Sequence, residues 1–262
     1  MDTTVSRKPW RMSHRVAEDL RRQIMRGNFD REERLPPVPA LAAQLGISQH
    51  HLREALRLLE QDNLVRVVSG RNGGIFIDPP DTGSLTRSFG LVLARSGTLL
   101  NDLMQARCVI EPALAALAAT EATDDDLSRI ALILDSHGQL GRYRAGINAE
   151  FHVAVAAATH NQTLLTMMTA MEQLLLSLDA RVGRRNADSD GVDLVGESLR
   201  AHNAIFRALQ SHNPEQAASL TLRHILGYKD AIAATGIDLD TYRIADLIED
   251  LAEGPSITEI GL

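Results

Sequence analysis

A chain of 262 residues of which 44% are hydrophobic can form one large core or two modest ones, because domains commonly span about 100 to 200 residues. Only 3% of the residues are aromatic, while Ala and Leu recur throughout, and this balance favours packed helices over sheets. The single cysteine, Cys108, excludes an internal disulfide. The N-terminus lacks the apolar stretch of a signal peptide, and charges interrupt every apolar run before it could span a membrane, so we expect a cytoplasmic protein.

The net charge of −7 is unevenly distributed along the chain. Residues 1–78 carry 13 Lys and Arg against 10 Asp and Glu, a net of +3, whereas the remainder carries 14 against 24, a net of −10. A basic head on an acidic body is compatible with a polyanionic partner such as DNA, although an ordinary solvated basic face gives the same count.

Residues 1–78 are expected to form three short helices followed by a β-hairpin. An apolar stripe of helical period predicts a helix over 13–26, and a second helix is expected over 38–45, each stopped by a glycine. The β-prone runs 64–68 and 74–77 flank a turn that contains glycines, as hairpins require. Helix, turn, helix and hairpin in this order predict a winged helix-turn-helix.

A third helix begins after Ser48, which is a suitable N-terminal capping residue. The major groove admits one α-helix, and side chains reach base edges only from the exposed face near its N-terminus. Arg there can pair with guanine and Gln with adenine, while positions further along suit phosphate. The alternative is that these are ordinary solvated side chains. The predicted DNA-contacting residues of the helix and the hairpin tip are Ser48, Gln49, His50, Arg53, Arg57, Arg71, Asn72 and Gly73.

The rest of the chain is helical in pattern almost to its end. The proline-containing segment 79–84 is expected to be a linker. The helical pattern of residues 85–236 predicts an all-α bundle of six or seven helices. The whole protein is therefore expected to be mainly α. The segment 237–262 contains a short amphipathic stretch at 242–251, and the sequence assigns it to neither core nor function.

Polar residues in the helical half form a candidate metal site. Asn148 and His152 stand at i and i+4, on one face of a helix. His202 and His224 each lie on the apolar side of a later helix, where an imidazole needs a partner. Three imidazoles with one oxygen donor suit zinc, nickel, iron or manganese and leave positions open for water or an incoming carboxylate. The alternative is a set of core histidines whose hydrogen bonds are satisfied within the protein.

Motifs in both halves point to one family. The head contains LRRQIMRGNF, LPPVPALAAQLGISQHHLREALRLLEQDNLV and GRNGGIFI, and the second half contains QARCVIEPALAALAA, NAEFHVAVAAATHNQTL and AHNAIFRALQSHNPEQAASLTLRHI. These segments resemble the GntR family of bacterial regulators, in its FadR-like branch with an FCD ligand-binding domain. The head departs from the family at Val38-Pro39-Ala40, where a polar Ser-Glu-Arg stretch is usual, and at Gln49, where Arg is usual.

The resemblance implies a divalent metal, zinc first, that is held by Asn148, His152, His202 and His224 and that receives an acidic small molecule. Asp is the commoner residue at the first of these positions. The resemblance also makes Arg107 the partner of the effector's carboxylate, although Glu111 lies on the same helix face and can pair with it instead.

Our leading hypothesis is a homodimeric repressor of double-stranded DNA operators, from which a small carboxylate metabolite releases it by changing the spacing of the two heads. A second hypothesis is a constitutive repressor whose histidines are structural. A metal-dependent enzyme is disfavoured, because the nearest acidic residue, Glu150, points about 200° around the helix from His152. The remaining candidates, His137, His160 and His212, are expected to be exposed turn residues.

Overall fold

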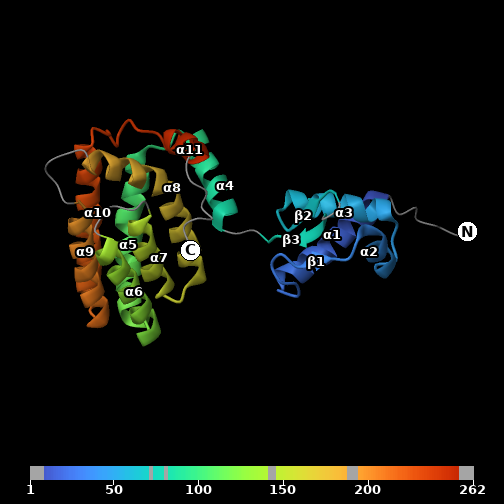
Figure 1. Ribbon diagram of the computed structural model, residues 1–262, viewed down its shortest axis with the longest axis horizontal. Helices are drawn as coiled ribbons and strands as arrows, with labels where there is room; N and C mark the ends of the chain where they lie inside the picture. Colours follow the sequence, from blue (N-terminus) through green and yellow to red (C-terminus); the bar gives the residue numbers. More distant parts are fainter. Residues whose placement is uncertain (1–8, 71–72, 80–81, 141–145, 188–193, 254–262) are drawn as a thin grey trace, which may run out of the picture. The chain divides into compact units, whose positions relative to one another are not determined.

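The computed structural model describes residues 9–70, 73–79, 82–140, 146–187 and 194–253 (Figure 1). The chain divides into two compact units, 1–81 and 82–262. Within the described ranges every helix is too short or too polar to cross a membrane.

The first unit combines three helices with a small sheet. Its elements are α1 (Pro9–Met25), β1 (Arg34–Leu35), α2 (Val38–Gln44), α3 (Gln49–Gln61), β2 (Val65–Val68) and β3 (Gly74–Ile77). The apolar stripes of α1 and α3 pack against each other and against the sheet, and Leu52, Leu59 and Ile77 are fully buried there. Each such side chain contributes about 1.5–3 kcal/mol through burial.

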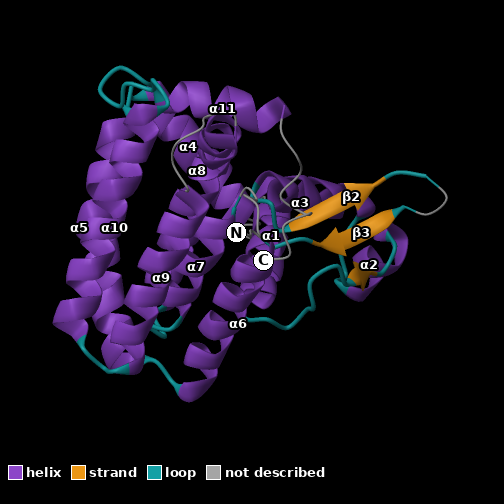
Figure 2. Cartoon of the chain, turned by 60° about the vertical axis from the view of Figure 1, so that its left-hand side comes forward, coloured by secondary structure: helices purple, strands orange, loops and turns teal. Residues whose placement is uncertain are grey.

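The sheet has three antiparallel strands in the order β1-β3-β2 (Figure 2). The hairpin of β2 and β3 is confirmed, but β1 was not predicted, because two residues in a polar loop carry no periodic pattern. Its position is set by pairing of Arg34 with Phe76 and of Leu35 with Ile75. The strand ties the loop before α2 to the outer edge of β3, which anchors the base of the hairpin.

The second unit is a bundle in which eight helices are described. They are α4 (Thr82–Arg95), α5 (Leu100–Glu121), α6 (Asp124–Leu140), α7 (Ile147–Ala157), α8 (Gln162–Ala187), α9 (Leu194–Gln210), α10 (Pro214–Ala234) and α11 (Ile244–Glu253). Seven of them begin before residue 236, in agreement with the expected number. α4 begins at Thr82, inside the segment that was expected to be a linker.

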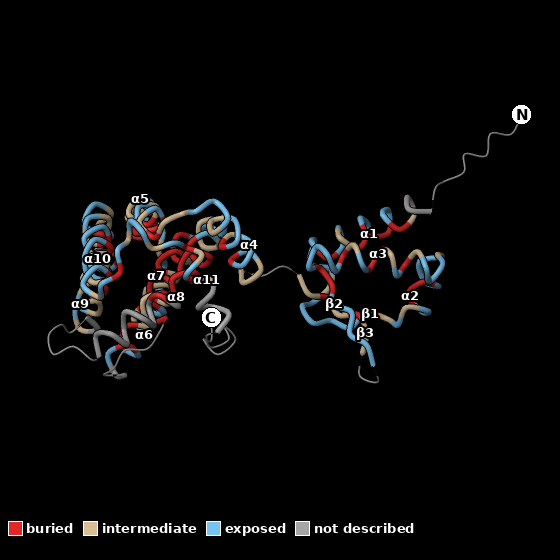
Figure 3. The backbone as a smooth tube through the Cα atoms, turned by 90° about the horizontal axis from the view of Figure 1, so that it is seen from above, coloured by how far each residue is buried: buried red, intermediate tan, exposed pale blue. Residues whose placement is uncertain are grey.

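The eighth helix, α11, shows that the described part of the segment after residue 236 contributes to the core. Ile244 and Leu247 are fully buried and join the cluster around Leu100. α11 packs on both α4 and α8. Gly90 permits the close approach of α4, since a Cβ there would lie 2.8 Å from a methyl carbon of Leu174 and 3.2 Å from one of Ile248. Figure 3 shows the buried positions on the sides of the helices that face one another.

One buried hydrogen bond joins α4 to α8. The hydroxyl of Thr86 donates to Oε1 of Gln173 at 2.6 Å, and Thr86 and Gln173 are 3% and 5% exposed. Thr86→Val is expected to lower the free energy of unfolding by about 1–3 kcal/mol, because it leaves a buried amide oxygen without its donor. Urea denaturation followed by circular dichroism measures the change.

The matched control is Thr120→Val, which alters an exposed helical threonine whose hydroxyl bonds the carbonyl oxygen of Ala116 within α5. It is expected to change stability by less than about 0.5 kcal/mol. Equal effects of the two substitutions would show that the bond between α4 and α8 contributes nothing.

Candidate functional site

The third helix of the first unit presents polar side chains to solvent. Ser48 caps α3 by accepting a hydrogen bond from the backbone N–H of His51 at 3.2 Å. Gln49, His50 and Arg53 are exposed in the first turns, and Arg57 is exposed one turn further on. The opposite face is buried in the core. These side chains are exposed, as the helical pattern of the sequence predicts, and their contact with DNA stays a prediction.

At the tip of the hairpin, Arg71 and Asn72 lie outside the described residues. Gly73 donates its N–H to Gly70 at 2.9 Å, and a Cβ at Gly73 would lie 2.2 Å from the carbonyl oxygen of Val68, so only glycine fits this turn. Arg34 from β1 donates to the carbonyl oxygen of Gly73. The turn is thus held from the neighbouring strand.

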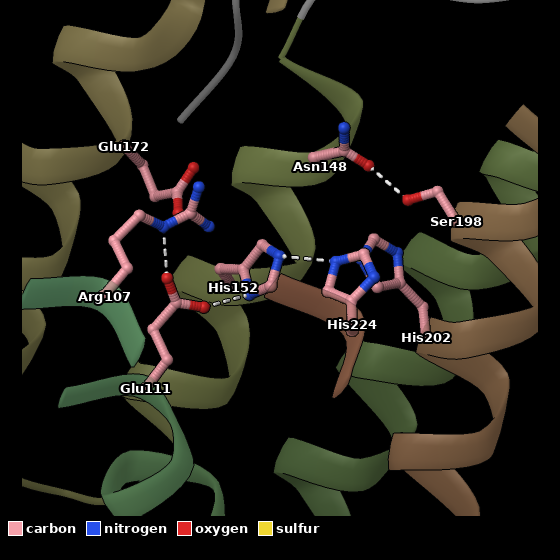
Figure 4. Close-up of polar contacts among 8 residues, drawn as sticks. All are labelled: Arg107, Glu111, Asn148, His152, Glu172, Ser198, His202 and His224. Atoms are coloured by element: carbon pink, nitrogen blue, oxygen red, sulfur yellow. Dashed lines mark hydrogen bonds and ion pairs between the residues drawn. The ribbon is translucent and has the colours of Figure 1, made fainter. Parts of the chain in front are cut away.

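Three histidines converge in the second unit (Figure 4). Nε2 of His224 lies 3.2 Å from Nε2 of His152 and 3.1 Å from Nε2 of His202. The three side chains come from α10, α7 and α9. Nitrogen ligands around a tetrahedral zinc ion lie about 3.3–3.4 Å apart, given Zn–N bonds of about 2.0–2.1 Å. The spacing of the three nitrogens therefore fits one metal ion.

A carboxylate orients one of these imidazoles. Oε2 of Glu111 lies 2.8 Å from Nδ1 of His152. The negative charge of the carboxylate favours the proton of the neutral ring on Nδ1, so that Nε2 keeps its lone pair and faces the other two histidines. Glu111 is 3% exposed and His152 is 5% exposed, so water does not compete for this contact.

Arg107 lies between two buried carboxylates. It donates to Glu111 on its own helix and to Oε1 of Glu172 on α8, the latter at 2.7 Å. All three side chains are at most 4% exposed. Of the two roles that the sequence left open for Arg107, the structure shows the pairing with Glu111. It adds Glu172, which the sequence did not single out.

Burial and charge set the protonation of this network. Burial by itself lowers the pKa of Arg107, but the charges of Glu111 and Glu172 outweigh it and raise that pKa above its usual value. Burial would raise the pKa of Glu111, but Arg107 and His152 lower it to about 2. Burial, together with neighbouring histidines, lowers the pKa of His224 to about 3 and that of His202 well below its usual value. Both imidazoles are therefore neutral near pH 7 and available as ligands.

Two of the three converging histidines, His202 and His224, border a cavity of about 420 Å³ between α9 and α10. Asn148 lies in its wall, where Oδ1 accepts a hydrogen bond from Ser198 at 2.6 Å. Figure 4 shows the amide oxygen of Asn148 turned toward Ser198. Arg107 does not line this cavity. It borders a much smaller one of about 10 Å³, together with Asn148, His152 and Glu172.

The histidines expected in exposed turns differ from one another. His137 is 3% exposed and lines the larger cavity, contrary to the expectation, and its Nε2 lies 3.0 Å from Glu150. His160 has a side chain that is 52% exposed and pairs with Asp126. His212 is exposed and bonds the carbonyl oxygen of Ala119 through Nδ1. The sequence missed His137 because its burial depends on helices that are distant in the chain.

Comparison with known proteins identifies both units. The family described as bacterial regulatory proteins, gntR family, matches residues 12–77, and the FCD domain matches residues 102–227. The putative L-lactate dehydrogenase operon regulatory protein of Escherichia coli is 32% identical over 222 residues, which cover 83% of this chain and 84% of that protein. The chain belongs to the GntR family of bacterial regulatory proteins.

Other relatives of this GntR protein agree. The HTH-type transcriptional regulator LutR of Bacillus subtilis is 26% identical and covers 80% of this chain and 96% of its own length. The HTH-type transcriptional repressor NanR of Edwardsiella tarda is 27% identical, with coverages of 82% and 83%. The solved structure of Streptococcus agalactiae GntR shares the fold, with a TM-score of 0.64 and 24% identity over 83% of this chain and 99% of that one. The protein is a DNA-binding transcriptional regulator and not an enzyme.

The buried histidines make the metal-free protein sensitive to acid. The unfolded chain binds a proton at His224 below about pH 6.5, whereas the folded protein binds it only near pH 3. Stability is therefore expected to fall as pH decreases through this range, by up to about 1.4 kcal/mol per pH unit for each such group. Glu111 adds to the loss between its ordinary pKa of 4.5 and its folded value of about 2.

Urea denaturation of chelator-treated protein at a series of pH values measures this slope. His224→Asn is expected to flatten it between pH 6 and pH 4, whereas His160→Gln, which removes an exposed histidine, keeps it. A wild-type slope that is unchanged in His224→Asn would show that this imidazole is not buried in its neutral form.

Proposed function

We propose that this GntR regulator is a homodimeric repressor that reads its operator through α3 and is released by a small carboxylate bound beside a divalent metal. The observation that carries the proposal is the meeting of three Nε2 atoms, 3.1 to 3.2 Å apart in two of the pairs, beside a cavity of about 420 Å³ that His202 and His224 line. Cavities of about 300–1,000 Å³ are typical of small-molecule sites.

The exposed residues of α3 support the DNA-contacting role. Arg53 and Gln49 stand on the face that a major groove would receive, and Oε1 of Gln49 lies 3.5 Å from Arg53. His50 is exposed beside them, and Arg57 lies on the same side, where phosphate contacts are expected. A palindromic operator needs two such helices about 34 Å apart, which requires a second copy of the chain.

The donor set of the second unit fits a divalent ion. Neutral imidazoles suit zinc first, and nickel, manganese or iron as well. His152, His202 and His224 would hold the ion, and Asn148 would become the fourth protein ligand if its amide oxygen turned from Ser198 toward the ion. Two carboxylates against one guanidinium in the adjoining network leave a local excess of negative charge, which favours a cation. A bound ion of this kind supplies a Lewis acid that accepts a carboxylate oxygen.

The relatives' names support a carboxylate effector. The Escherichia coli protein is named for an operon of L-lactate dehydrogenase. Lactate is a small carboxylate, and an anion of this kind would be drawn to the metal within the cavity.

Arg53→Ala is expected to weaken binding to the operator by about 1–3 kcal/mol, because it removes a contact to a base edge. Fluorescence polarisation compares DNA from upstream of the protein's own gene with shuffled DNA at several salt concentrations. Arg129→Ala removes the same charge from an exposed position on α6 and is expected to bind as the wild type does. If Arg53→Ala weakens operator and shuffled DNA equally, the residue contacts phosphate only.

Purified protein is expected to contain about one zinc ion per chain, and zinc is expected to raise the thermal midpoint of chelator-treated protein. Replacing His152, His202 and His224 together by Ala should abolish both effects. Elemental analysis measures the zinc content, and calorimetry measures the thermal midpoint. The control is the double substitution of His160 and His212 by Ala, which is expected to keep both effects. Unchanged metal content and stability in the triple variant would favour the constitutive repressor with structural histidines.

A further inference from the structure

A fourth histidine lies beside the three that converge. His137 stands in the last turn of α6, and α6 packs on both α7 and α9. Its side chain is 3% exposed, yet it borders the same cavity as Asn148, His202 and His224. It does not belong to the group whose ring nitrogens meet. A buried imidazole in a cavity wall costs free energy unless its nitrogens are paired, so its place calls for a physical explanation.

Glu150 fixes the orientation of this ring. Its Oε2 lies 3.0 Å from Nε2 of His137, and its own side chain is 17% exposed. With Nε2 facing the carboxylate, Nδ1 is the ring nitrogen that remains for a ligand. In the neutral ring Nδ1 accepts a hydrogen bond, and in the protonated ring it donates one. A hydroxyl group satisfies either form, because it both donates and accepts.

The cavity wall around His137 is polar on more than one side. Ser198 from α9 and Asn148 from α7 border the same space and bond each other at 2.6 Å. Alanine and leucine side chains line other parts of the wall, namely Leu199, Ala201, Ala204, Leu220 and Ala231. A ligand that reaches His202 and His224 therefore meets hydrogen-bonding groups from four helices, α6, α7, α9 and α10.

We propose that His137, positioned by Glu150, recognises a hydroxyl group of the effector, so that the effector is a hydroxylated carboxylate and not a plain alkyl acid. The inference rests on the proposed function, because it assumes that the carboxylate binds at the three convergent histidines. His137 then determines specificity without holding the metal.

A second pair of the same chemistry lies on the surface and provides the control. His160 contacts Asp126 at 2.8 Å, as His137 contacts Glu150, but its side chain is 52% exposed and it does not border the cavity. A substitution at His160 removes the same ring and the same kind of pair without touching the effector site.

The test is calorimetric titration of the zinc-loaded, full-length protein with pairs of acids that differ in their hydroxyl groups, L-lactate against propionate and D-gluconate against hexanoate. At least one hydroxylated acid is expected to bind about tenfold more tightly than its alkyl partner, the effect of one hydrogen bond. His137→Phe should reduce this preference to less than about twofold, and His160→Phe should keep it. His137→Gln, which retains a hydrogen-bonding group, should restore part of it.

Zinc stoichiometry and the thermal midpoint establish that each variant is folded. Glu150→Gln is a second variant, which keeps the imidazole of His137 and is expected to weaken the preference for hydroxylated acids. Equal binding of alkyl and hydroxylated acids by the wild type, or a preference that persists in His137→Phe, would overturn the inference. If zinc binds and no acid of either kind does, the carboxylate effector itself is wrong, and the failure is that of the proposed function.

Discussion

The buried ion pairs of Arg107 with Glu111 and Glu172 are the interaction on which the functional end of the second unit depends. They join α5 to α8 in a region that water does not reach. Removing one partner of such a network leaves an uncompensated charge and costs about 3–5 kcal/mol. The network also contacts the candidate metal site, because the second carboxylate oxygen of Glu111 pairs with His152. Stability of the bundle and geometry of the candidate metal centre therefore share one set of side chains.

The same network is linked to α4 through α8. Glu172 pairs with Arg107, and the next residue, Gln173, accepts the hydrogen bond of Thr86 on α4. α4 is the helix that begins where the first unit ends. Adjacent residues on a helix cannot move independently of each other, so a displacement of α8 at Glu172 changes the contact at Thr86 as well. The close packing at Gly90, against Leu174 and Ile248, makes that contact sensitive to small shifts.

Sequence patterns predicted the features that depend on residues close together in the chain. The capping of α3 by Ser48 and its buried stripe follow from sequence spacing alone. The strand β1 did not, because its two residues are extended only through pairing with β3. The site divides in the same way. The contact of Arg107 with Glu111 spans one helical turn and was visible, whereas Glu172 lies in an otherwise apolar stripe of α8, 65 positions from its partner. The glycine after His137 predicts a turn at this position, whereas the packing of α6 on α7 and α9 buries the histidine.

The charges of the buried side chains around the three histidines explain why the proposed site would suit both a cation and an anion. Two of the histidines at the centre, His202 and His224, are neutral because burial lowers their pKa values. Glu111 and Glu172 face the single positive charge of Arg107, so the protein contributes one net negative charge next to the three imidazoles. The proposed divalent cation would reverse this to one net positive charge, and the proposed monoanionic carboxylate would restore neutrality. An unbalanced charge is costly in a medium of low dielectric. The net negative charge of the protein therefore favours binding of the cation, and the net positive charge that results favours binding of the carboxylate. An aspartate at position 148 would add a negative charge, whereas Asn148 is uncharged. The negative charge that completes neutrality is therefore left to the ligand.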